Sequence, residues 1–241
     1  MPSAWSRSLE SPMSARHKKA ASEGGPQSAP APRGRGVPAV FLDRDGTVSE
    51  EVGYINHISR LQVYPWSAEA IRKLNRAEHP VIMVTNQSGV ARGYFTEELV
   101  NAVHQKIASE LAAHGARIDA TYYCPHHPNA KLDAYRIDCQ CRKPLTGMVE
   151  AAARKFHIDL ARSYVVGDSY RDMQLGFNAG TRTILVMTGY GRGEYEHHRQ
   201  GWPRMPDRVA ENLLEAAEII LGETGRAGAA APGDSLTSQP L

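Results

Sequence analysis

Two aspartates one residue apart, Asp43 and Asp45, are the residues of this chain with the clearest chemical potential. They lie in the stretch VFLDRDGT (residues 40–47), just after a short apolar run. Residues two apart in a strand point to the same side, so both carboxylates can reach one small volume. Mg²⁺ takes hard oxygen ligands and is often bound by one or two carboxylates together with phosphate oxygens. The stretch taken alone also fits an ordinary polar turn, because Asp and Gly are common turn residues.

Three further polar clusters favour phosphate chemistry over a simple turn. In VIMVTNQSG (residues 81–89), the hydroxyl of Thr85 follows an apolar run, and in YVVGDSYRD (residues 164–172), Asp168 follows another. The stretch CQCRKP (residues 139–144) contains Lys143 just before a proline. Open α/β sheets bind ligands outside the carboxyl ends of their strands, where most of these residues are expected. Taken in chain order, which is the aspartate pair, Thr85, Lys143 and then Asp168, the four clusters resemble the haloacid dehalogenase superfamily of phosphotransferases over residues 37–221.

The chemistry of such a site assigns a role to each of these residues. Phosphoryl transfer requires in-line positioning and neutralisation of charge. We expect Asp43 to be the nucleophile that forms an aspartyl-phosphate, and Asp45 to be the acid and base that serves the leaving group and the water. Asp43, Asp168 and the backbone carbonyl of Asp45 are the expected Mg²⁺ ligands. Thr85 would hold phosphoryl oxygens, with Lys143 as a point charge beside them.

Asp172, four residues after Asp168, has two possible roles. It either supports the metal shell or orients Lys143, or it is an exposed acid that the dipole of a helix's first turn favours.

All three cysteines of the chain fall in one short segment. Cys124-Pro-His126 is followed, after twelve residues, by Cys139-Gln-Cys141. Three thiolates and an imidazole make a closed tetrahedral Zn²⁺ site of the structural kind. His127 is the alternative imidazole, and free buried thiols are the alternative to a metal site. A disulfide would leave one cysteine unpaired, and pairing Cys139 with Cys141 would be strained. We expect this zinc loop to position Arg142 and Lys143.

The zinc loop followed by RKP, together with DRDGT and TNQSGVARG, resembles the heptose-bisphosphate phosphatases within that superfamily. Histidinol-phosphate phosphatases share the zinc loop and much of the motif set. The resemblance implies Asp43, Asp45 and Asp168 as Mg²⁺ ligands and Cys124, His126, Cys139 and Cys141 as Zn²⁺ ligands. It implies substrate contacts from two short segments and two cations: Glu51, Val52, Gly53, Tyr54, Thr85, Asn86, Gln87, Ser88, Arg142 and Lys143. One departure is Ser169, where members of the family often have lysine.

The alternation of apolar runs and helical patterns predicts a three-layer, Rossmann-like α/β fold with helices on both faces of a parallel sheet. The expected strands are 37–42, 81–85, 120–123, 164–166 and 183–187. The expected helices are 67–76, 96–114, 146–156, 172–179 and 207–221. We expect residues 189–195 (GYGRGEY) to be a flexible loop, and six histidines to be exposed and without a role: His79, His104, His114, His157, His197 and His198.

The amino-acid composition indicates which parts of the chain can form a folded domain. Residues 1–36 and 222–241 are poor in large aliphatic residues and are expected to be disordered. One phosphatase domain, residues 37–221, remains; it is too short for a large separate cap, so the active site should be open. A net charge of +2 without interleaved aromatic residues argues against nucleic-acid binding.

No apolar run is long enough to cross a membrane. Reduced cysteines and a phosphorylated sugar substrate predict a cytoplasmic enzyme, and we expect a monomer.

The rival function class is a zinc-stabilised binding module that has lost catalysis. That class predicts damage to the aspartate pair or to the lysine, and both are intact. A kinase would need a nucleotide cradle, and the sequence contains no P-loop.

Overall fold

The computed structural model describes residues 36–229 of the 241, and all of them belong to one compact unit. The expected disordered extension lies outside the described residues, apart from Gly36. Of the expected disordered tail, residues 230–241 lie outside them, while residues 222–229 continue the last helix. That helix therefore runs eight residues past the expected end of the domain.

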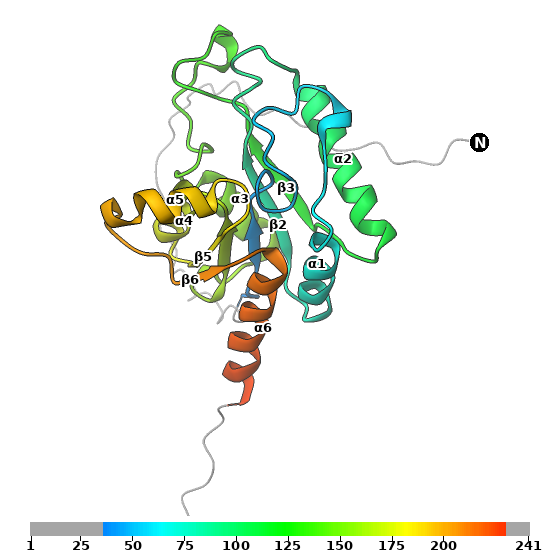
Figure 1. Cartoon of the computed structure of the whole chain (residues 1–241), viewed down its shortest axis with the longest axis vertical. Helices are drawn as coiled ribbons and strands as arrows, with labels where there is room; N and C mark the ends of the chain where they lie inside the picture. The colour runs from blue at the N-terminus through cyan, green and yellow to red at the C-terminus, as the bar shows by residue number, and fades with distance from the viewer. Residues whose placement is uncertain (1–35, 230–241) are drawn as a thin grey trace, which may run out of the picture. The chain divides into compact units, whose positions relative to one another are not determined.

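A six-stranded, entirely parallel sheet forms the centre of this unit (Figure 1). Its strand order is β3-β2-β1-β4-β5-β6. The strands are β1 (Val40–Leu42), β2 (Val81–Asn86), β3 (Ala120–Cys124), β4 (Tyr164–Gly167), β5 (Arg182–Val186) and β6 (Arg208–Ala210). The strand order reverses beside β1, which pairs with β2 on one side and β4 on the other. The predicted α/β fold with a parallel sheet is confirmed.

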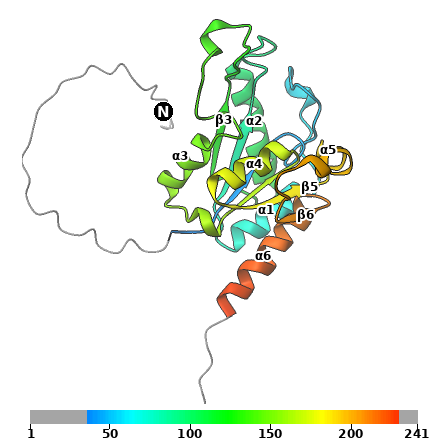
Figure 2. The same cartoon turned by 90° about the vertical axis from the view of Figure 1, so that its left-hand side faces the viewer.

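Helices cover both faces of the sheet, which gives three layers (Figure 2). One face packs against α1 (Ser67–Arg76), α2 (Glu97–Ala113) and α6 (Leu213–Ala229). The other face packs against α3 (Gly147–Phe156) and α4 (Tyr170–Ala179). Within β1, Val40 and Leu42 face the first group of helices, whereas Phe41 faces the second. This alternation explains why the central strands consist almost wholly of apolar residues.

The register of the central strands decides where the polar residues meet. Leu42 of β1 pairs with Met83 of β2 and with Val166 of β4, so the three strands end at nearly the same level. Beyond that level, the backbone NH of Asp43 still donates to the carbonyl of Val166 at 3.0 Å. The segments that follow β1, β2 and β3 gather at this end of the sheet (Figure 1). The polar residues after each strand therefore share one edge.

Two expectations near the C-terminal end were wrong. The stretch expected to be a flexible loop contains the start of α5 (Gly191–His198), and the expected helix 207–221 is divided into β6 and α6. Gly191 can begin α5 because it lies against the carbonyl of Val186, where a Cβ would have no room. β6 forms because its residues pair with β5 and extend the sheet by one strand.

Two of the histidines expected to be exposed are covered. His79 is 5% exposed, and its Nδ1 lies 3.2 Å from the carbonyl oxygen of Pro38. His104 is partly buried, and its Nε2 lies 3.4 Å from Nη1 of Arg44. Within residues 36–229, no helix combines the length and apolar content that crossing a membrane requires.

Candidate active site

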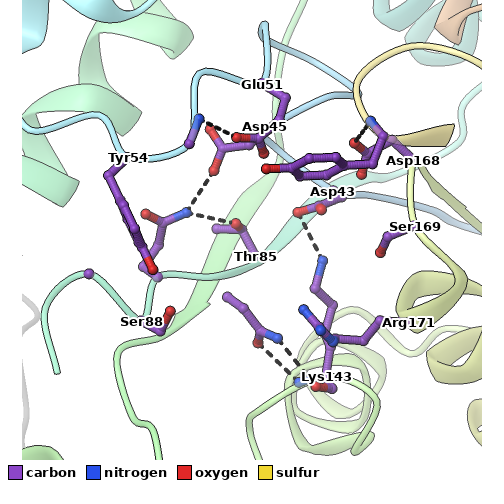
Figure 3. A pocket seen from close by; sticks show the side chains of 15 residues that line it. Asp43, Asp45, Glu51, Tyr54, Thr85, Ser88, Lys143, Asp168, Ser169 and Arg171 are labelled. Atoms are coloured by element: carbon purple, nitrogen blue, oxygen red, sulfur yellow. Dashed lines mark hydrogen bonds and ion pairs between the residues drawn. The ribbon is translucent and has the colours of Figure 1, made fainter. Parts of the chain in front are cut away.

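A pocket of about 270 Å³ opens at the carboxyl edge of the sheet (Figure 3). It brings together eleven residues that the sequence nominated: Asp43, Asp45, Glu51, Gly53, Tyr54, Thr85, Asn86, Gln87, Ser88, Lys143 and Asp168. Two nominated residues, Val52 and Arg142, do not line it. Four residues that were not assigned to the site do: Gly89, Ser169, Arg171 and Tyr190.

Lys143 lies at the bottom of this pocket between two carboxylates. Its Nζ is 2.9 Å from Oδ1 of Asp43 and 2.6 Å from Oδ1 of Asp172. It also donates to the carbonyl of Val84 at 3.1 Å, which uses all three of its donors. Asn86 exchanges two hydrogen bonds with the backbone of Lys143. The end of β2 therefore fixes the position of the lysine.

Asp172 is a buried member of the site, with 1% of its surface exposed. One of its oxygens accepts from Lys143. The other accepts from the hydroxyl of Ser169 at 2.6 Å and from its backbone NH at 3.2 Å, which caps the start of α4. Of the roles considered for Asp172, this geometry favours orientation of the lysine.

The carboxylate of Asp168 packs directly against the backbone of two glycines. Gly46 and Gly189 both have positive φ angles, of 79° and 54°. A Cβ at either position would overlap the Asp168 carboxylate. The backbone NH of Tyr190 donates to that carboxylate at 2.9 Å. The loop 187–190 after β5 is therefore part of the site wall.

The carboxylates of Asp43, Asp168 and Asp172 lie within 4.8 Å of one another, and among residues 36–229 the ammonium of Lys143 is the one cation that forms ion pairs with them. Burial raises the pKa of Asp43 to about 7, although Lys143 opposes the shift. Burial and the neighbouring Asp43 raise the pKa of Asp168 to about 9. Burial favours the neutral form of Lys143, but Asp172 and Asp43 outweigh it and raise the pKa of the lysine. This excess of buried acid fits a divalent cation with oxygen ligands.

Asp45 lies outside that carboxylate cluster and has its own network. Arg44, which is 2% exposed, binds both of its oxygens, with distances of 2.9 Å from Nε and 2.7 Å from Nη2. Gln87 donates to the Asp45 carboxylate at 3.0 Å and lies 2.9 Å from the hydroxyl oxygen of Thr85. Burial and the nearby Arg44 lower the pKa of His104 to about 3, so its ring is neutral. Asp45 is thus held in one orientation at the pocket wall.

The segment 51–54 forms the opposite side of the pocket. The carboxylate of Glu51 accepts from the backbone NH of Gly53, and burial raises the pKa of Glu51. Tyr54 packs edge-on against Tyr94, with ring centroids 4.9 Å apart. Val52 instead packs against the main apolar core, which explains why it does not line the pocket. Tyr54 is 37% exposed, so this side is open to solvent.

The predicted zinc ligands lie within 4.8 Å of one another. They are Cys124, His126, Cys139 and Cys141. The Sγ atoms of Cys124 and Cys139 are 3.6 Å apart, and none of the three thiols is in a disulfide. His126 Nδ1 lies 3.3 Å from Sγ of Cys141 and 3.7 Å from Sγ of Cys124. With zinc–sulfur bonds of about 2.3 Å, two thiolates of a tetrahedral site are about 3.8 Å apart. The cluster therefore fits a zinc ion.

Arg142 follows the last cysteine and borders a second hollow next to the pocket. Its Nη1 donates to the carbonyl of His126 at 3.1 Å, which ties it to the zinc loop. Burial lowers the pKa of Arg142, and the guanidiniums of Arg171 and Arg92 lower it further. Arg142 and Arg171 both line this hollow, so these two cations lie at this rim of the site.

Sequence reasoning missed the site roles of Arg44, Arg171 and Tyr190. Arg44 stands inside the DRDGT motif, so its position between two site residues was an available signal. Tyr190 follows Gly189 in the stretch expected to be a flexible loop, and only the fold brings it to Asp168. Arg171 stands on the first turn of α4, and no feature of the sequence distinguishes it from an exposed helical arginine.

Comparisons with known proteins agree with this geometry. The HAD-hydrolase-like family model matches residues 140–216. The D-glycero-D-manno-heptose-1,7-bisphosphate 7-phosphatase of Thermosynechococcus vestitus is 44% identical over 191 residues, which cover 76% of this chain and 95% of that protein. The corresponding enzyme of Escherichia coli K12 is 42% identical over 64% of this chain and 82% of its own length. The chain therefore belongs to the family of HAD-like phosphatases that includes these two heptose-bisphosphate phosphatases.

Solved structures support the same family. The D,D-heptose 1,7-bisphosphate phosphatase of B. bronchiseptica, solved with magnesium and phosphate, has a TM-score of 0.69 and 39% identity. The match covers 78% of this chain and 99% of that one. The Burkholderia thailandensis enzyme matches with a TM-score of 0.57 and 34% identity, over 76% of this chain and 98% of that one. The predicted superfamily and the predicted class of enzyme, a phosphatase, are confirmed.

Proposed function

We propose that this phosphatase removes the 7-phosphate of D-glycero-D-manno-heptose 1,7-bisphosphate, a step toward the nucleotide-activated heptose of the lipopolysaccharide core. The observation that carries the proposal is the 44% identity to a relative of that activity across 95% of the relative's length. The pocket, in which an aspartate pair and a buried lysine meet, supplies the chemistry.

In the proposed mechanism, the carboxylate of Asp43 attacks phosphorus while the bond from phosphorus to the sugar oxygen breaks. Asp45 gives a proton to the departing sugar oxygen. A water then attacks the aspartyl-phosphate, Asp45 accepts the proton of that water, and inorganic phosphate leaves Asp43 free. Lys143 balances the negative charge of Asp43 and of the phosphoryl oxygens, and Thr85 and Ser88 border the space these oxygens occupy.

Mg²⁺ is the metal that we propose for the carboxylate cluster, held by Asp43, Asp168 and the backbone carbonyl of Asp45. When bound, it neutralises charge between the nucleophile and the phosphate. The buried excess of acid at this cluster supports the assignment, as does the magnesium in the B. bronchiseptica structure. We assign Asp172 to Lys143 and not to the metal, because its oxygens accept from Lys143 and from the hydroxyl and backbone NH of Ser169.

Zn²⁺ is the metal that we propose for Cys124, His126, Cys139 and Cys141. Sulfur ligands favour zinc over magnesium, and four protein ligands leave no open position for substrate. The role of zinc is therefore structural: it orders a loop that ends at Arg142 and Lys143.

We further propose that the enzyme is a cytoplasmic monomer without nucleic-acid or membrane partners. Three cysteines that bind zinc and form no disulfide fit a reducing compartment.

Steady-state kinetics on a panel of phosphate esters tests the proposal. We expect kcat/KM to be highest for the heptose 1,7-bisphosphate, with phosphorus NMR showing loss of the 7-phosphate alone. Histidinol phosphate and nucleoside monophosphates should be poorer by at least about 100-fold, since neither fills the sugar and second-phosphate positions. A higher kcat/KM for histidinol phosphate would refute the proposed substrate and leave the phosphatase assignment intact.

A further inference from the structure

Arg171 has an unusual place in the molecule. It is an exposed residue on the first turn of α4, and it borders two hollows at once. One is the reaction pocket (Figure 3). The other is the neighbouring hollow of about 480 Å³, which is lined in part by residues of the zinc loop and by Arg142. Lys143 and Arg171 are the two residues that both hollows share.

Arg171 is also a cation whose charge the described residues leave uncompensated. The reaction pocket is lined by two cations, Lys143 and Arg171. Lys143 is saturated by two carboxylates and a carbonyl, whereas no ion pair between residues 36 and 229 includes Arg171. The helix dipole disfavours a positive charge in a first turn, so an anionic ligand at this position would also relieve an electrostatic cost.

We propose that Arg171 binds the second phosphate of the substrate, the one that is not hydrolysed, and that the hollow shared with Arg142 is the subsite for it. This inference rests on the proposed function, because only a bisphosphate places an anion there. A planar guanidinium can bind a phosphate through two parallel hydrogen bonds. Arg142 is fixed against the zinc loop through one nitrogen, so its remaining donors are available to the same anion.

The other charged residues of this hollow fit the assignment. Arg136 is occupied by Asp133 at 2.9 Å and by the carbonyl of Ala130 at 2.7 Å, so it adds little free charge. Asp138 is the one carboxylate among the residues lining the hollow. Arg142 and Arg171 together outweigh it, which leaves a net positive subsite about the size of a phosphate and part of a sugar.

The test compares two substrates that differ only in the second phosphate: the heptose 1,7-bisphosphate and the heptose 7-phosphate. Arg171→Gln should lower kcat/KM for the bisphosphate about 10- to 100-fold, mainly through KM, and lower kcat/KM for the 7-phosphate by a much smaller factor, because only the bisphosphate loses a contact to its second phosphate. Arg171→Lys should lose less than Arg171→Gln, because it keeps the charge. Arg154→Gln, an exposed change on α3 away from both hollows, is the matched control and should change neither substrate.

The outcomes separate the inference from the function on which it rests. Equal losses for both substrates, or no loss for the bisphosphate, would overturn the role of Arg171 while the wild-type preference for the bisphosphate stands. A wild-type enzyme that turns over the 7-phosphate as well as the bisphosphate would instead refute the proposed function, and the inference with it. Thermal unfolding of Arg171→Gln at the wild-type temperature would show that the variant is folded.

Discussion

At the scale of single residues, Lys143 connects the parts of the site. Its side chain joins Asp43 to Asp172, and its backbone is held by Asn86. Lys143 is 4% exposed and Asp172 is 1% exposed, so this pair has almost no access to water, whereas Asp43 faces the pocket. The positions of Asp43 and Lys143 in their motifs predicted this neighbourhood. The capping of α4 through Asp172, by contrast, could not be predicted without the fold.

Lys143→Met should reduce both activity and stability. The variant leaves Asp43 and Asp172 buried together without a counter-charge, which costs about 3 kcal/mol in typical buried pairs. Urea unfolding without added metal measures the loss, with Lys155→Met on the exposed side of α3 as the control. An unfolding free energy within about 0.5 kcal/mol of wild type would show that the pair contributes little to the fold.

Asp45→Asn should slow poor leaving groups more than good ones. A sugar alkoxide needs a proton as it departs, whereas p-nitrophenolate does not, so the amide removes help that only the sugar requires. We expect the variant to lose about 100-fold or more in kcat on the sugar phosphate and much less on p-nitrophenyl phosphate. Asp43→Asn serves as the comparison and should abolish both activities. Equal losses for the two substrates with Asp45→Asn would count against the acid role.

At the scale of secondary structure, the long periodic elements could be predicted and the short ones could not. α2 begins where its signals indicate, because Thr96 accepts a hydrogen bond from the NH of Leu99 and two glutamates occupy the first turn. β6 has only three residues, too few for a periodic pattern, and it exists because β5 offers an edge. α5 begins in a glycine-rich stretch, where local propensity disfavours a helix and packing against β5 decides.

Without zinc, the zinc loop should become less ordered, while the sheet should remain ordered. Its four ligands cross-link residues 124–141, and after the end of β3 at Cys124 the only regular element of this segment is a single turn at Asp133–Tyr135. Purified protein should contain one zinc per chain. In hydrogen-exchange mass spectrometry, Cys139→Ser should speed exchange across residues 131–143 and leave β1 and β4 protected. Faster exchange throughout the sheet would show that the zinc site supports the whole domain.

At the scale of the whole molecule, the parallel sheet gathers residues from β1, β2 and β4 at one edge, and this places buried acid where a metal can bind. The chain order of the four motifs was enough to predict this convergence. Which exposed arginine faces the pocket was not predictable, since the packing of α4 and the zinc loop decides it. Arg171 and Arg142 illustrate the difference: one lines the reaction pocket, and the other lines only the adjoining hollow.

The raised pKa values predict how stability depends on pH and on Mg²⁺. Asp43 and Asp168 have pKa values of about 7 and about 9 in the fold, against an ordinary value of 3.8. Their ionisation therefore opposes folding: the cost is absent below about pH 4 and grows as pH rises through 7 and 9. Without metal, Tm should be lower at pH 8.5 than at pH 6.

Added Mg²⁺ should raise Tm more at pH 8.5 than at pH 6, because it binds the ionised carboxylates of the folded state. Calorimetry at the two pH values, with and without Mg²⁺, measures both effects. Asp168→Asn should reduce the fall in Tm between pH 6 and pH 8.5. A metal-free Tm that rises over this interval would contradict the electrostatics derived for the cluster.

The covalent step on Asp43 is the centre of the account, and rapid quenching tests it directly. Enzyme mixed with the heptose bisphosphate and Mg²⁺ is quenched in acid within milliseconds, digested and analysed by mass spectrometry. We predict a transient gain of one phosphate on the peptide that contains Asp43, and none in Asp43→Asn. Turnover without any phosphorylated peptide, or a phosphate on another residue, would contradict the mechanism.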